Sequence, residues 1–468
     1  MSYLYEQVAS ELGEAIEKGV FPPGARLPSI RNTQKRFGVS VATAMEAFAR
    51  LEVEGLIEVR PKSGHFVKPR SEQAARPRMS NPEQHPGSVS IVDMALEMVA
   101  ASQAPGAIPF AAGFPGAEVL QLDSLARIQA RAVRTSRKRL AGIEPPEGMP
   151  ALRHGISRLI ADAGAIVEPS GVVVTNGAQE ALNLALRAVT SPGDVVAVES
   201  PTYFGVLQAI ESLGLKALEL PTHPEHGVSI EALEKAVSGG AISACVLSPS
   251  YQNPLGFCMN DDDKRRVVEL LEGHDVPLIE DDVWGCLGLA NPRPVTAKSF
   301  DRSGNVILLS SFSKTVSPGL RLGWMAPGKF LQEVVRQKFL VNLSTGVVQQ
   351  QAIADFLDGS RFRRLTQSSS KIYARRRKFL RDAVIRHFPP GTLCSVPRGG
   401  FFIWVELPGN VDSYELFKLA VNEGISFSPG RLYSRTSTYS HCLRLSCSVD
   451  DDAVVENAIR ELAWLVPR

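Results

Sequence analysis

The sequence predicts an α/β protein made of a small N-terminal winged helix-turn-helix and a larger domain built on a mainly parallel sheet. Three helical patterns and a two-stranded hairpin fill residues 1–70. Residues 71–90 are rich in Pro, Ser and charge and have no apolar periodicity, which is typical of a flexible linker. From residue 145 onward, apolar strand-like runs alternate with helical patterns, and this order favours parallel β pairing.

The composition is that of an ordinary globular protein, with 44% hydrophobic and 21% charged residues among 468. This length is too great for one hydrophobic core. The net charge is only +2, so any nucleic-acid binding must depend on a local basic patch. The six cysteines include no C-x-x-C pair, which predicts no metal site and a reducing, cytoplasmic location. No apolar run reaches the length of a membrane span.

The N-terminal pattern begins with an amphipathic helix whose apolar residues are Leu4, Val8, Leu12, Ala15 and Ile16. Ser29 is placed to cap a second helix, from about residue 30 to residue 37, and Ser40 to cap a third that ends near Gly55. The segments LIEV and HFV flank the turn RPKSG and predict a hairpin. Two helices joined by a short glycine-containing turn and followed by a hairpin are typical of a winged helix-turn-helix.

Basic residues gather where such a domain would meet DNA. The segment from Arg26 to Arg36 holds four basic residues and no acidic one, and Arg60, Lys62 and His65 lie at the hairpin tip. A recognition helix in the major groove and a basic wing on the backbone would use these groups. A small helical docking module is the alternative, because the same region carries many acids, but the pattern favours DNA binding.

The stretch LPSIRNTQKRFGVSVATAMEAFARLEVEGLIEVRPKSGHFV makes this part specific. With its LPS-x-R opening, GVS turn, LE-x-x-GLI stretch and SG-x-F-V wing, it resembles a GntR-type winged helix domain over residues 2–69. It departs at Val41 and Ala42, where that family often has a basic or polar residue. The candidate DNA-binding residues are therefore Arg31, Ser40, Thr43, Arg50, Lys62 and His65.

Lys314 is the leading candidate in the large domain. It follows the apolar run 306–309 within SFSKTVSPGLRLGW, so it lies at the mouth of a buried strand. An amine that is desolvated there stays nucleophilic and suits a Schiff base, while Ser311, Ser313 and Arg321 can hold an anionic phosphate. A surface lysine after a core strand is the alternative for this motif taken alone.

Four other strand ends carry residues that suit a ligand, which in α/β folds binds beyond the carboxyl ends of the strands. A turn of small residues can bring backbone amides to a phosphate, a ring can stack on a flat ligand, and a strand-end carboxylate can pair with a protonated ring nitrogen. These residues are Gly177, Ala178 and Gln179 in the turn, then Tyr203, Asn253 and Asp281. A tight corner, a half-buried aromatic or a capping carboxylate would explain single members of the set.

Together, this order of motifs resembles the fold-type-I, aminotransferase-like family that binds pyridoxal 5′-phosphate. The resemblance covers about residues 105–466 and includes FAAGFPGAEVLQLDSL, PRGGFFIWVELP and CLRLSCS. It implies a domain over residues 91–468, with a mainly parallel, seven-stranded type of sheet in a large part at about 130–340. A smaller α+β subdomain is expected at about 341–468.

By this resemblance, Lys314 carries the internal aldimine and Asp281 pairs with the pyridinium nitrogen. Asn253 is expected to bond the ring hydroxyl, Tyr203 to stack on the ring, and Arg444 to clamp the carboxylate of an amino acid. The phosphate is expected at Gly177, Ala178, Gln179, Ser311, Ser313 and Arg321.

One departure from the family concerns Trp284, three residues after Asp281. Many relatives have a tyrosine there, whose hydroxyl also bonds the ring oxygen. Indole offers one N–H and no acceptor, so we expect Trp284 to contact the cofactor in a different way.

A GntR-type winged helix joined to an aminotransferase-like domain is the architecture of MocR-type regulators, which this chain resembles. The resemblance implies a homodimeric transcriptional regulator that binds a double-stranded DNA operator. It would sense an amino acid, an amine or pyridoxal 5′-phosphate itself through the aldimine at Lys314. An active aminotransferase with a DNA-binding appendage is the alternative, since Lys314, Asp281 and Arg444 would also serve transamination. The near-complete winged helix favours the regulator.

A basic stretch between Arg361 and Arg381 holds nine Lys or Arg residues and no acidic one. It suits either a second DNA-contact surface or a solvated helix face of the small subdomain. We favour the solvated face, because aminotransferase-like proteins often carry arginines at this place.

Overall fold

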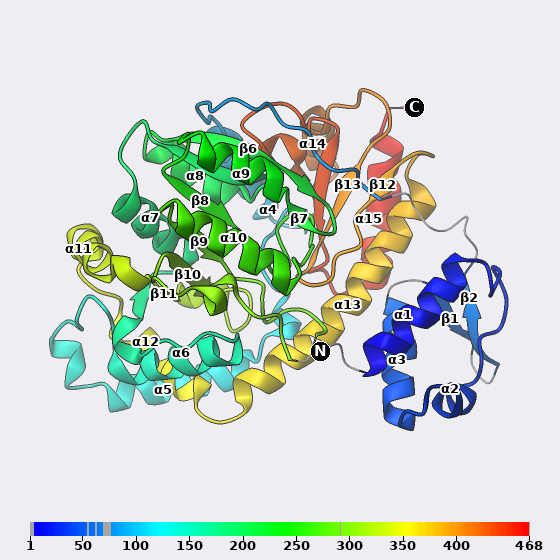
Figure 1. Ribbon diagram of the computed structural model, residues 1–468, viewed down its shortest axis with the longest axis horizontal. Coiled ribbons are helices and arrows are strands. Elements are labelled where there is room, and N and C mark those ends of the chain that lie inside the picture. Colours follow the sequence, from blue (N-terminus) through cyan, green and yellow to red (C-terminus); the bar gives the residue numbers. More distant parts are fainter. Residues whose placement is uncertain (1–3, 54–55, 61–62, 69–75, 291, 468) are drawn as a thin grey trace.

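The two predicted parts of the chain lie side by side, with the winged helix in dark blue at one edge of the molecule (Figure 1). The computed structural model describes residues 4–53, 56–60, 63–68, 76–290 and 292–467. Over these ranges, no helix is long and apolar enough to cross a membrane.

The N-terminal part consists of α1 (Leu4–Glu17), α2 (Ile30–Phe37), α3 (Val41–Val53), β1 (Ile57–Arg60) and β2 (Gly64–Val67), the two strands pairing as a hairpin. Ser29 begins α2, because its Oγ accepts a hydrogen bond from the backbone N of Asn32 at 3.2 Å. Gly38 ends the helix in the left-handed conformation, with φ 64°. The helices bury one apolar cluster that includes Val8, Leu12, Ala44, Phe48 and Leu51. This is the predicted winged helix-turn-helix.

The described half of the predicted linker, residues 76–90, is bound to the large domain. Gly87 and Ala217 exchange two backbone hydrogen bonds, at 3.0 and 2.9 Å. Ala217 belongs to β6 (Lys216–His223), whose outer edge would otherwise expose unpaired backbone groups. The composition predicted a flexible linker, but pairing with a strand edge fixes this half, and local composition carries no signal for such pairing.

The large domain is built on one sheet with strand order β4-β11-β10-β9-β8-β5-β6-β7. Neighbours from β10 to β6 are parallel, whereas β11 runs antiparallel to both of its neighbours and β7 antiparallel to β6. The bounds are β4 (Val173–Thr175), β5 (Val195–Ser200), β7 (Gly227–Val228), β8 (Ala244–Leu247), β9 (Leu278–Asp281), β10 (Val306–Ser311) and β11 (Gly323–Ala326). The sheet is mainly parallel, as predicted.

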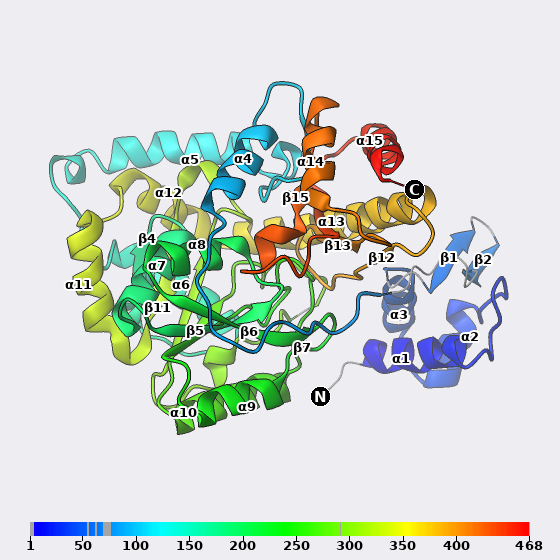
Figure 2. The same cartoon turned by 90° about the horizontal axis from the view of Figure 1, so that it is seen from above.

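Helices cover both faces of this sheet, which explains why strands such as β10 are buried at every residue. Seen from above, β5 and β6 lie between α8 on one side and α9 and α10 on the other (Figure 2). The helix bounds are α4 (Val92–Ser102), α5 (Leu122–Thr135), α6 (Pro150–Asp162), α7 (Ala178–Val189), α8 (Phe204–Ser212), α9 (Ile230–Ser238), α10 (Asp261–Gly273), α11 (Leu331–Asn342) and α12 (Val347–Leu357).

The C-terminal subdomain is the expected smaller α+β unit. Its antiparallel sheet has the order β12-β13-β16-β15. A separate parallel pair, β14 with β3, ties the start of the large domain to this subdomain. The bounds are β3 (Ile108–Pro109), α13 (Arg361–His387), β12 (Leu393–Cys394), β13 (Phe402–Glu406), α14 (Ser413–Asn422), β14 (Ile425–Ser426), β15 (Ser428–Pro429), β16 (Cys442–Ser446) and α15 (Asp452–Leu465).

Helix α13 carries the basic stretch, and the expectation of a solvated face holds for only part of it. Arg376 and Arg377 are buried, where Arg376 pairs with Glu118 at 2.5 Å and Arg377 donates to the carbonyl of Gly400. Exposed basic residues on the same helix are Arg361, Arg363, Arg364, Lys371 and Arg375. The two buried arginines therefore hold the subdomain together instead of facing solvent.

The winged helix packs beside the C-terminal portion of α13 (Figures 1 and 2). Helix α3 contacts α13, and Lys68 Nζ lies 3.9 Å from Asp382 Oδ2. Asp382 also pairs with Lys378 of the same helix, at 2.9 Å. Helix α13 therefore joins the winged helix to the C-terminal subdomain.

Replacing Phe48 by alanine should loosen the winged helix selectively. The ring is 1% exposed within the cluster that the three helices share, so its loss should cost about 3–5 kcal/mol. Hydrogen exchange of residues 4–68, followed by mass spectrometry, measures the effect. Leu4→Ala changes a side chain that is 61% exposed and should leave exchange unchanged. Equal exchange in the two variants would contradict the packing described.

Candidate functional site

The turns that follow several strands meet at one edge of the large sheet. The register pairs Leu309 of β10 with Asp281 at the end of β9, and Ser311 with Gly323 of β11. Gly323 in turn pairs with Thr175, the last residue of β4. These pairings align the strand ends, so the turns after Thr175, Asp281 and Ser311 lie together, at the edge where α/β sheets bind ligands.

Lys314 lies three residues beyond the end of β10, where it is half-buried. Its Nζ donates a hydrogen bond to the carbonyl of Gly113 at 2.5 Å. The same atom lies 4.8 Å from the ring centroid of Phe114 and 5.7 Å from that of Trp284. The amine is therefore held between a backbone carbonyl and two aromatic faces.

The charges around Lys314 make it a better nucleophile than an ordinary lysine. Its pKa is lowered to about 7, first by burial and then by the guanidinium groups of Arg444 and Arg321. Asp281 acts in the opposite direction with a smaller effect. An amine with this pKa is neutral in a large fraction of molecules at pH 7, and the neutral amine is the form that attacks a carbonyl.

Asp281 ends β9 with its carboxyl turned into the same region. Its Oδ1 accepts a hydrogen bond from the backbone N of Val283 at 3.0 Å. Burial raises the pKa of Asp281 to about 6, and the neighbouring Asp282 acts in the same direction. A buried carboxylate of this kind is stabilised by a cationic N–H partner, which is the role that the sequence predicts for it.

The predicted phosphate turn is formed by Gly177 and the first residue of α7, Ala178. Gly177 has φ +85°, and a Cβ built on it would lie 2.8 Å from Nη2 of Arg321, so glycine is required here. Arg321 Nη1 donates to Ser313 Oγ at 3.4 Å, and the backbone N of Ser313 donates to Ser311 Oγ at 3.4 Å. A helix N-terminus, two hydroxyls and a guanidinium are thus brought together, which favours an anion.

Gln179 and Tyr203 both approach Gly205 closely. The side chain of Gln179 donates to the Gly205 carbonyl at 2.8 Å, so it braces this corner, and its backbone remains for the predicted phosphate contact. A Cβ built on Gly205 would lie 2.3 Å from Cε1 of Tyr203, so glycine makes room for the ring. Burial, followed by the charge of Asp281, raises the pKa of Tyr203 to about 12, which keeps its hydroxyl a proton donor.

Arg444 is only 1% exposed, and no described Asp or Glu pairs with it. Its Nη2 donates to the carbonyl of Ala111 at 2.6 Å and its Nη1 to Asn253 Oδ1 at 3.2 Å. The guanidinium rests on Phe402, 3.9 Å from the ring centroid. Within the described residues Nε has no hydrogen-bond partner, and the only groups that raise the pKa of Arg444 against its burial are the two tyrosines at 203 and 433. The carboxylate of a ligand would supply the missing negative charge and accept a hydrogen bond from the guanidinium.

Asn253 thus has a second task besides the predicted bond to a ring hydroxyl. Its Oδ1 accepts from Arg444, and the side chain is 5% exposed. The predicted bond would add a further contact to an amide that already orients the guanidinium.

Trp284 lies where the family pattern favours tyrosine. The indole is 4% exposed and meets the rings of Phe401 and Phe402 edge to face, with centroids 4.9 and 5.0 Å apart. This packing turns the face of the indole toward Lys314 Nζ. An aromatic face therefore lies beside the amine where many relatives have a hydroxyl.

Sequence reasoning did not predict the loop 111–114. The carbonyls of Ala111 and Gly113 accept hydrogen bonds from Arg444 and Lys314, respectively. The signal was present in the small residues of FAAGFPGAEVLQLDSL, which let a backbone approach a site closely. That pattern does not say which side chains the loop will face, because they come from β16 and from the turn after β10.

Two of the predicted DNA-binding hydroxyls organise the start of α3. Ser40 Oγ accepts from the backbone N of Thr43 at 3.0 Å, and the two hydroxyl oxygens lie 2.8 Å apart. Arg31 is exposed on α2, where a guanidinium can reach a phosphate. Lys62 falls outside the described residues.

Arg50 and His65 are engaged inside the winged helix. Arg50 Nη1 pairs with Glu6 Oε1 at 3.0 Å, which joins α3 to α1. The His65 ring lies against Phe48, with centroids 4.6 Å apart, and burial lowers its pKa. These contacts give both residues a structural role in addition to the predicted DNA contact.

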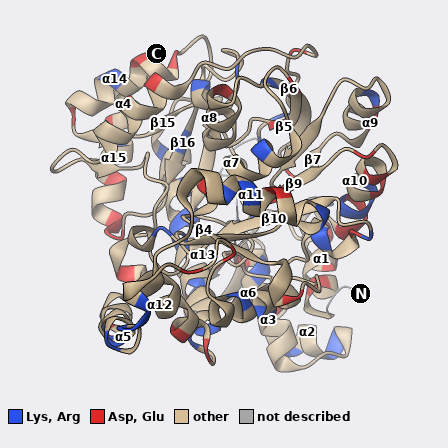
Figure 3. Ribbon diagram, turned by 90° about the vertical axis from the view of Figure 1, so that its left-hand side faces the viewer, with Lys and Arg blue, Asp and Glu red and all other residues tan. Residues whose placement is uncertain are grey.

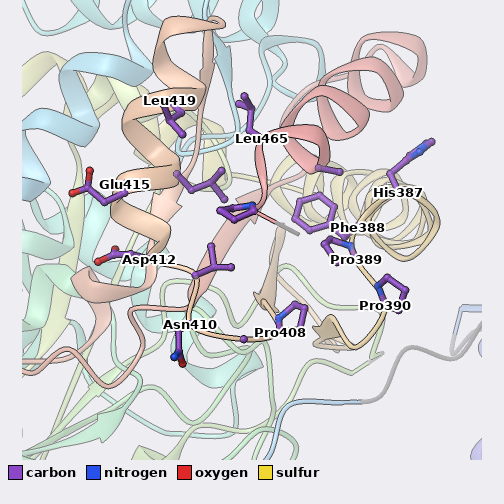
Figure 4. A pocket seen from close by; sticks show the side chains of 15 residues that line it. His387, Phe388, Pro389, Pro390, Pro408, Asn410, Asp412, Glu415, Leu419 and Leu465 are labelled. Carbon is purple, nitrogen blue, oxygen red and sulfur yellow. The ribbon is translucent and has the colours of Figure 1, made fainter.

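A separate cavity of about 870 Å³ lies away from all of these residues (Figure 4). It is formed between the end of α13, α14 and the end of α15, and its lining includes His387, Phe388, Asp412, Leu419 and Leu465. No predicted site residue lines it. The candidate site is therefore defined by its converging polar groups and not by this cavity.

Two stretches of the chain match known families. Residues 4–67 match the bacterial regulatory proteins of the gntR family, and residues 108–462 match aminotransferase class I and II. Over 99% of both chains, the protein is 36% identical to "Uncharacterized HTH-type transcriptional regulator YjiR" of Escherichia coli. It is 29% identical to "Probable rhizopine catabolism regulatory protein MocR" of Rhizobium meliloti, over 91% of this chain and 86% of that one. The chain belongs to the MocR-type family of regulators.

Solved structures similar to this MocR-type chain include aminotransferases. LysN, an α-aminoadipate aminotransferase of Thermus thermophilus complexed with N-(5′-phosphopyridoxyl)-L-leucine, is 27% identical over 81% of this chain and 98% of its own, with a TM-score of 0.72. The kynurenine aminotransferase of Pyrococcus horikoshii is 28% identical over 80% of this chain and 93% of its own, with a TM-score of 0.73. The predicted fold-type-I aminotransferase fold is confirmed.

The residues of this MocR-type chain fit the cofactor of that fold, pyridoxal 5′-phosphate. The turn at Gly177 leaves space that a Cβ would fill, beside the Arg321 guanidinium. Lys314 offers an amine with a pKa of about 7, and Asp281 offers a half-buried carboxyl at the end of β9. Each group of the cofactor thus has a matching partner: the phosphate, the aldehyde and the ring nitrogen.

Capture of pyridoxal 5′-phosphate should depend on pH through Lys314. Because only the neutral amine attacks an aldehyde, the rate should rise as the pH increases through about 7 and then level off. Stopped-flow absorbance measures this rate. Lys314→Ala should abolish the absorbance band of the lysine-bound cofactor, whereas Lys371→Ala, at an exposed position on α13, should preserve it. A rate that continues to rise by about tenfold per pH unit above pH 8 would contradict the lowered pKa, because an amine with an ordinary lysine pKa behaves in that way.

Proposed function

We propose that this protein is a transcriptional regulator that binds a DNA operator through its winged helix and senses an α-amino acid, an amine or pyridoxal 5′-phosphate at Lys314. The observation that carries the proposal is Arg444, a buried guanidinium that pairs with no described carboxylate, in a chain that also has a winged helix. A homodimer located in the cytoplasm is part of the proposal.

The bound cofactor supplies an electrophilic carbon and, through its ring, an electron sink. Lys314 provides the amine that reacts with that carbon, and its lowered pKa keeps the amine in the reactive form. Arg444 binds the carboxylate of the effector, with Asn253 orienting the guanidinium at 3.2 Å. Asp281 keeps the ring nitrogen protonated, because a carboxylate stabilises the cationic form.

Two hydrogen bonds of the loop 111–114 would change when cofactor and effector bind. Lys314 would leave the Gly113 carbonyl once its nitrogen is bonded to the cofactor. Arg444 would exchange the Ala111 carbonyl for a carboxylate, a stronger acceptor. The loop therefore differs in its contacts between the free and the bound states, and such differential contacts are what shifts an equilibrium.

Helix α13 is the element that touches both the site and the winged helix. Tyr373 of α13 packs on Phe401, with centroids 4.8 Å apart, and Phe401 packs on Trp284. Nearer the C-terminus of α13, Asp382 pairs with Lys68, which directly follows the hairpin. A shift of α13 upon effector binding would therefore reach the DNA-binding domain without any further element.

Exposed apolar residues on and after α11 support the homodimer. Phe339, Leu340, Val341 and Leu343 are between 47% and 67% exposed, and they follow one another on a single segment. An apolar patch of this kind is typical of a surface that a protein partner covers. A second copy would also supply a second winged helix for a paired half-site.

An active aminotransferase is the second candidate, because Lys314, Asp281 and Arg444 are all in place. A panel of amino acids, added to the cofactor-loaded protein, separates the two functions. A sensor changes its absorbance and its DNA affinity without releasing keto acid, whereas steady release of keto acid would favour the enzyme. The DNA probe is the duplex that the protein itself selects from a random-sequence pool.

Arg444→Met should weaken the response to amino acids by roughly 100-fold, because a buried charge pair with the effector is lost. Pyridoxal 5′-phosphate should still bind, since the phosphate site at Gly177 does not include Arg444, but the pH dependence of its capture should move to higher pH, because Arg444 lowers the pKa of Lys314. Titration by absorbance measures both. Arg187→Met, at an exposed arginine of α7, is the matched control. Equal losses in the two variants would contradict the assignment of Arg444.

Arg31→Ala should lower DNA affinity for all sequences to a similar extent, because an exposed guanidinium at this place contacts phosphate and not a base. The slope of log affinity against log salt concentration should fall by about 1. Fluorescence anisotropy at several salt concentrations measures this slope. Lys216→Ala, at an exposed residue of β6 in the large domain, should change nothing. An unchanged slope in Arg31→Ala would remove this residue from the DNA interface.

A further inference from the structure

A buried lysine on α11 lies behind the turn that receives the phosphate. Lys338 has no exposed side-chain surface, and its Nζ lies 3.3 Å from Glu180 Oε2. The same atom donates to Asn342 Oδ1 at 3.1 Å and to Thr345 Oγ1 at 3.2 Å. Helices α11 and α7 are neighbours, as Figure 3 shows. A fully buried ammonium is costly unless it is paired, so this position is built around Glu180.

Glu180 belongs to the first turn of α7 and spans the phosphate turn from behind. Its carboxylate accepts from the backbone N of Asn176 at 2.5 Å and from the Asn176 side chain at 3.2 Å. Gly177 and Ala178 lie between these two residues in the chain. Glu180 therefore links the residue before the turn, Asn176, to the first turn of α7, and so it constrains the backbone of the turn at Gly177.

Lys338 also reaches the strand that leads into this turn. Thr345, which accepts a hydrogen bond from Lys338 Nζ, donates to the carbonyl of Val174 in β4 at 3.4 Å. One ammonium group thus contacts, directly or through one hydroxyl, both the strand before the turn and the helix after it. Lys338 therefore stabilises both flanks of the turn at Gly177.

The charge of Glu180 explains why a cation is needed there. A phosphate group brings negative charge to a turn that already has a carboxylate within one helical turn, and like charges at this range repel each other. Neutralising the carboxylate from the far side removes this repulsion while leaving its hydrogen bonds to Asn176 in place. Burial lowers the pKa of Lys338, and Glu180 opposes that effect, as expected for a coupled pair.

We propose that Lys338 is a positioning residue for the cofactor phosphate. It neutralises Glu180 and holds the turn from Asn176 to Ala178 in a shape that accepts the anion, without touching the cofactor. This inference rests on the proposed function, because it requires that the cofactor be bound with its phosphate at this turn.

The test compares pyridoxal 5′-phosphate with pyridoxal, which has the same aldehyde and no phosphate. Lys338→Met leaves the carboxylate of Glu180 without its cation, so the affinity for pyridoxal 5′-phosphate should fall by about tenfold or more. The affinity for pyridoxal should change by less than about twofold, because the aldehyde reacts with Lys314 at the other end of the cofactor. The absorbance band of the lysine-bound aldehyde reports both affinities.

Glu180→Gln, which removes the negative charge, tells whether Lys338 acts on the phosphate through this charge or only stabilises the fold. Glu180→Gln deletes the repelling charge while keeping an oxygen for the Asn176 amide, so it should bind pyridoxal 5′-phosphate as tightly as the wild type or more tightly. The double variant with Lys338→Met should recover most of the affinity lost in the single variant. A purely structural ion pair would instead make both single variants lose affinity for both aldehydes.

The possible results test the role of Lys338 and the proposed function separately. If the wild type forms no Lys314-dependent band with pyridoxal 5′-phosphate, the proposed function is wrong, and the role of Lys338 with it. If the wild type forms the band and Lys338→Met binds both aldehydes normally, the inference alone is overturned. If Lys338→Met fails to fold by circular dichroism, Glu180→Gln decides: weaker binding of pyridoxal 5′-phosphate overturns the inference, and preserved binding supports it.

Discussion

The organisation of the site depends on an excess of positive charge. Arg444 is buried, Lys314 is half-buried and Arg321 is exposed; the two guanidinium groups lower the pKa of Lys314, and the carboxyl of Asp281 opposes them. Removing a guanidinium such as that of Arg444 from water is costly, so the fold supplies neutral acceptors, among them the carbonyl of Ala111. Neutral oxygens compensate a guanidinium only in part, since charge-assisted hydrogen bonds are stronger. The same imbalance therefore lowers the pKa of the amine and favours two anions, a phosphate and a carboxylate.

The groups that would bind an effector are the same groups that would process a substrate. An amine, a strand-end carboxyl and a buried guanidinium serve transamination as well as recognition. What distinguishes a regulator is the attachment of a second binding domain to the element that senses the site. Helix α13 makes contacts in both directions: its Tyr373 packs on Phe401, which packs on Trp284, and its Asp382 pairs with Lys68 of the N-terminal part.

The phosphate end of the site has its own supporting layer. Lys338 and Glu180 lie behind the turn at Gly177, and their pairing joins α11 to α7. The segment that carries Lys338 also exposes apolar residues on its outer side. The turn at Gly177 and this apolar surface both depend on α11. A partner that covered α11 would therefore also stabilise the turn.

The sequence by itself determined the winged helix and the alternation of strands and helices, because periodicity and capping at Ser29 are local properties. The positions of the candidates Lys314 and Gly177 were predictable for the same reason: each lies within three residues of the end of its own strand. Tertiary structure alone decided that β11 enters the sheet antiparallel, and that residues 76–90 pair with an edge strand. It also decided that Arg444 meets the loop 111–114. The pairings of β11 with β4, of Gly87 with Ala217 and of Arg444 with Ala111 each join segments more than a hundred residues apart. No local pattern encodes which distant surface a residue will meet.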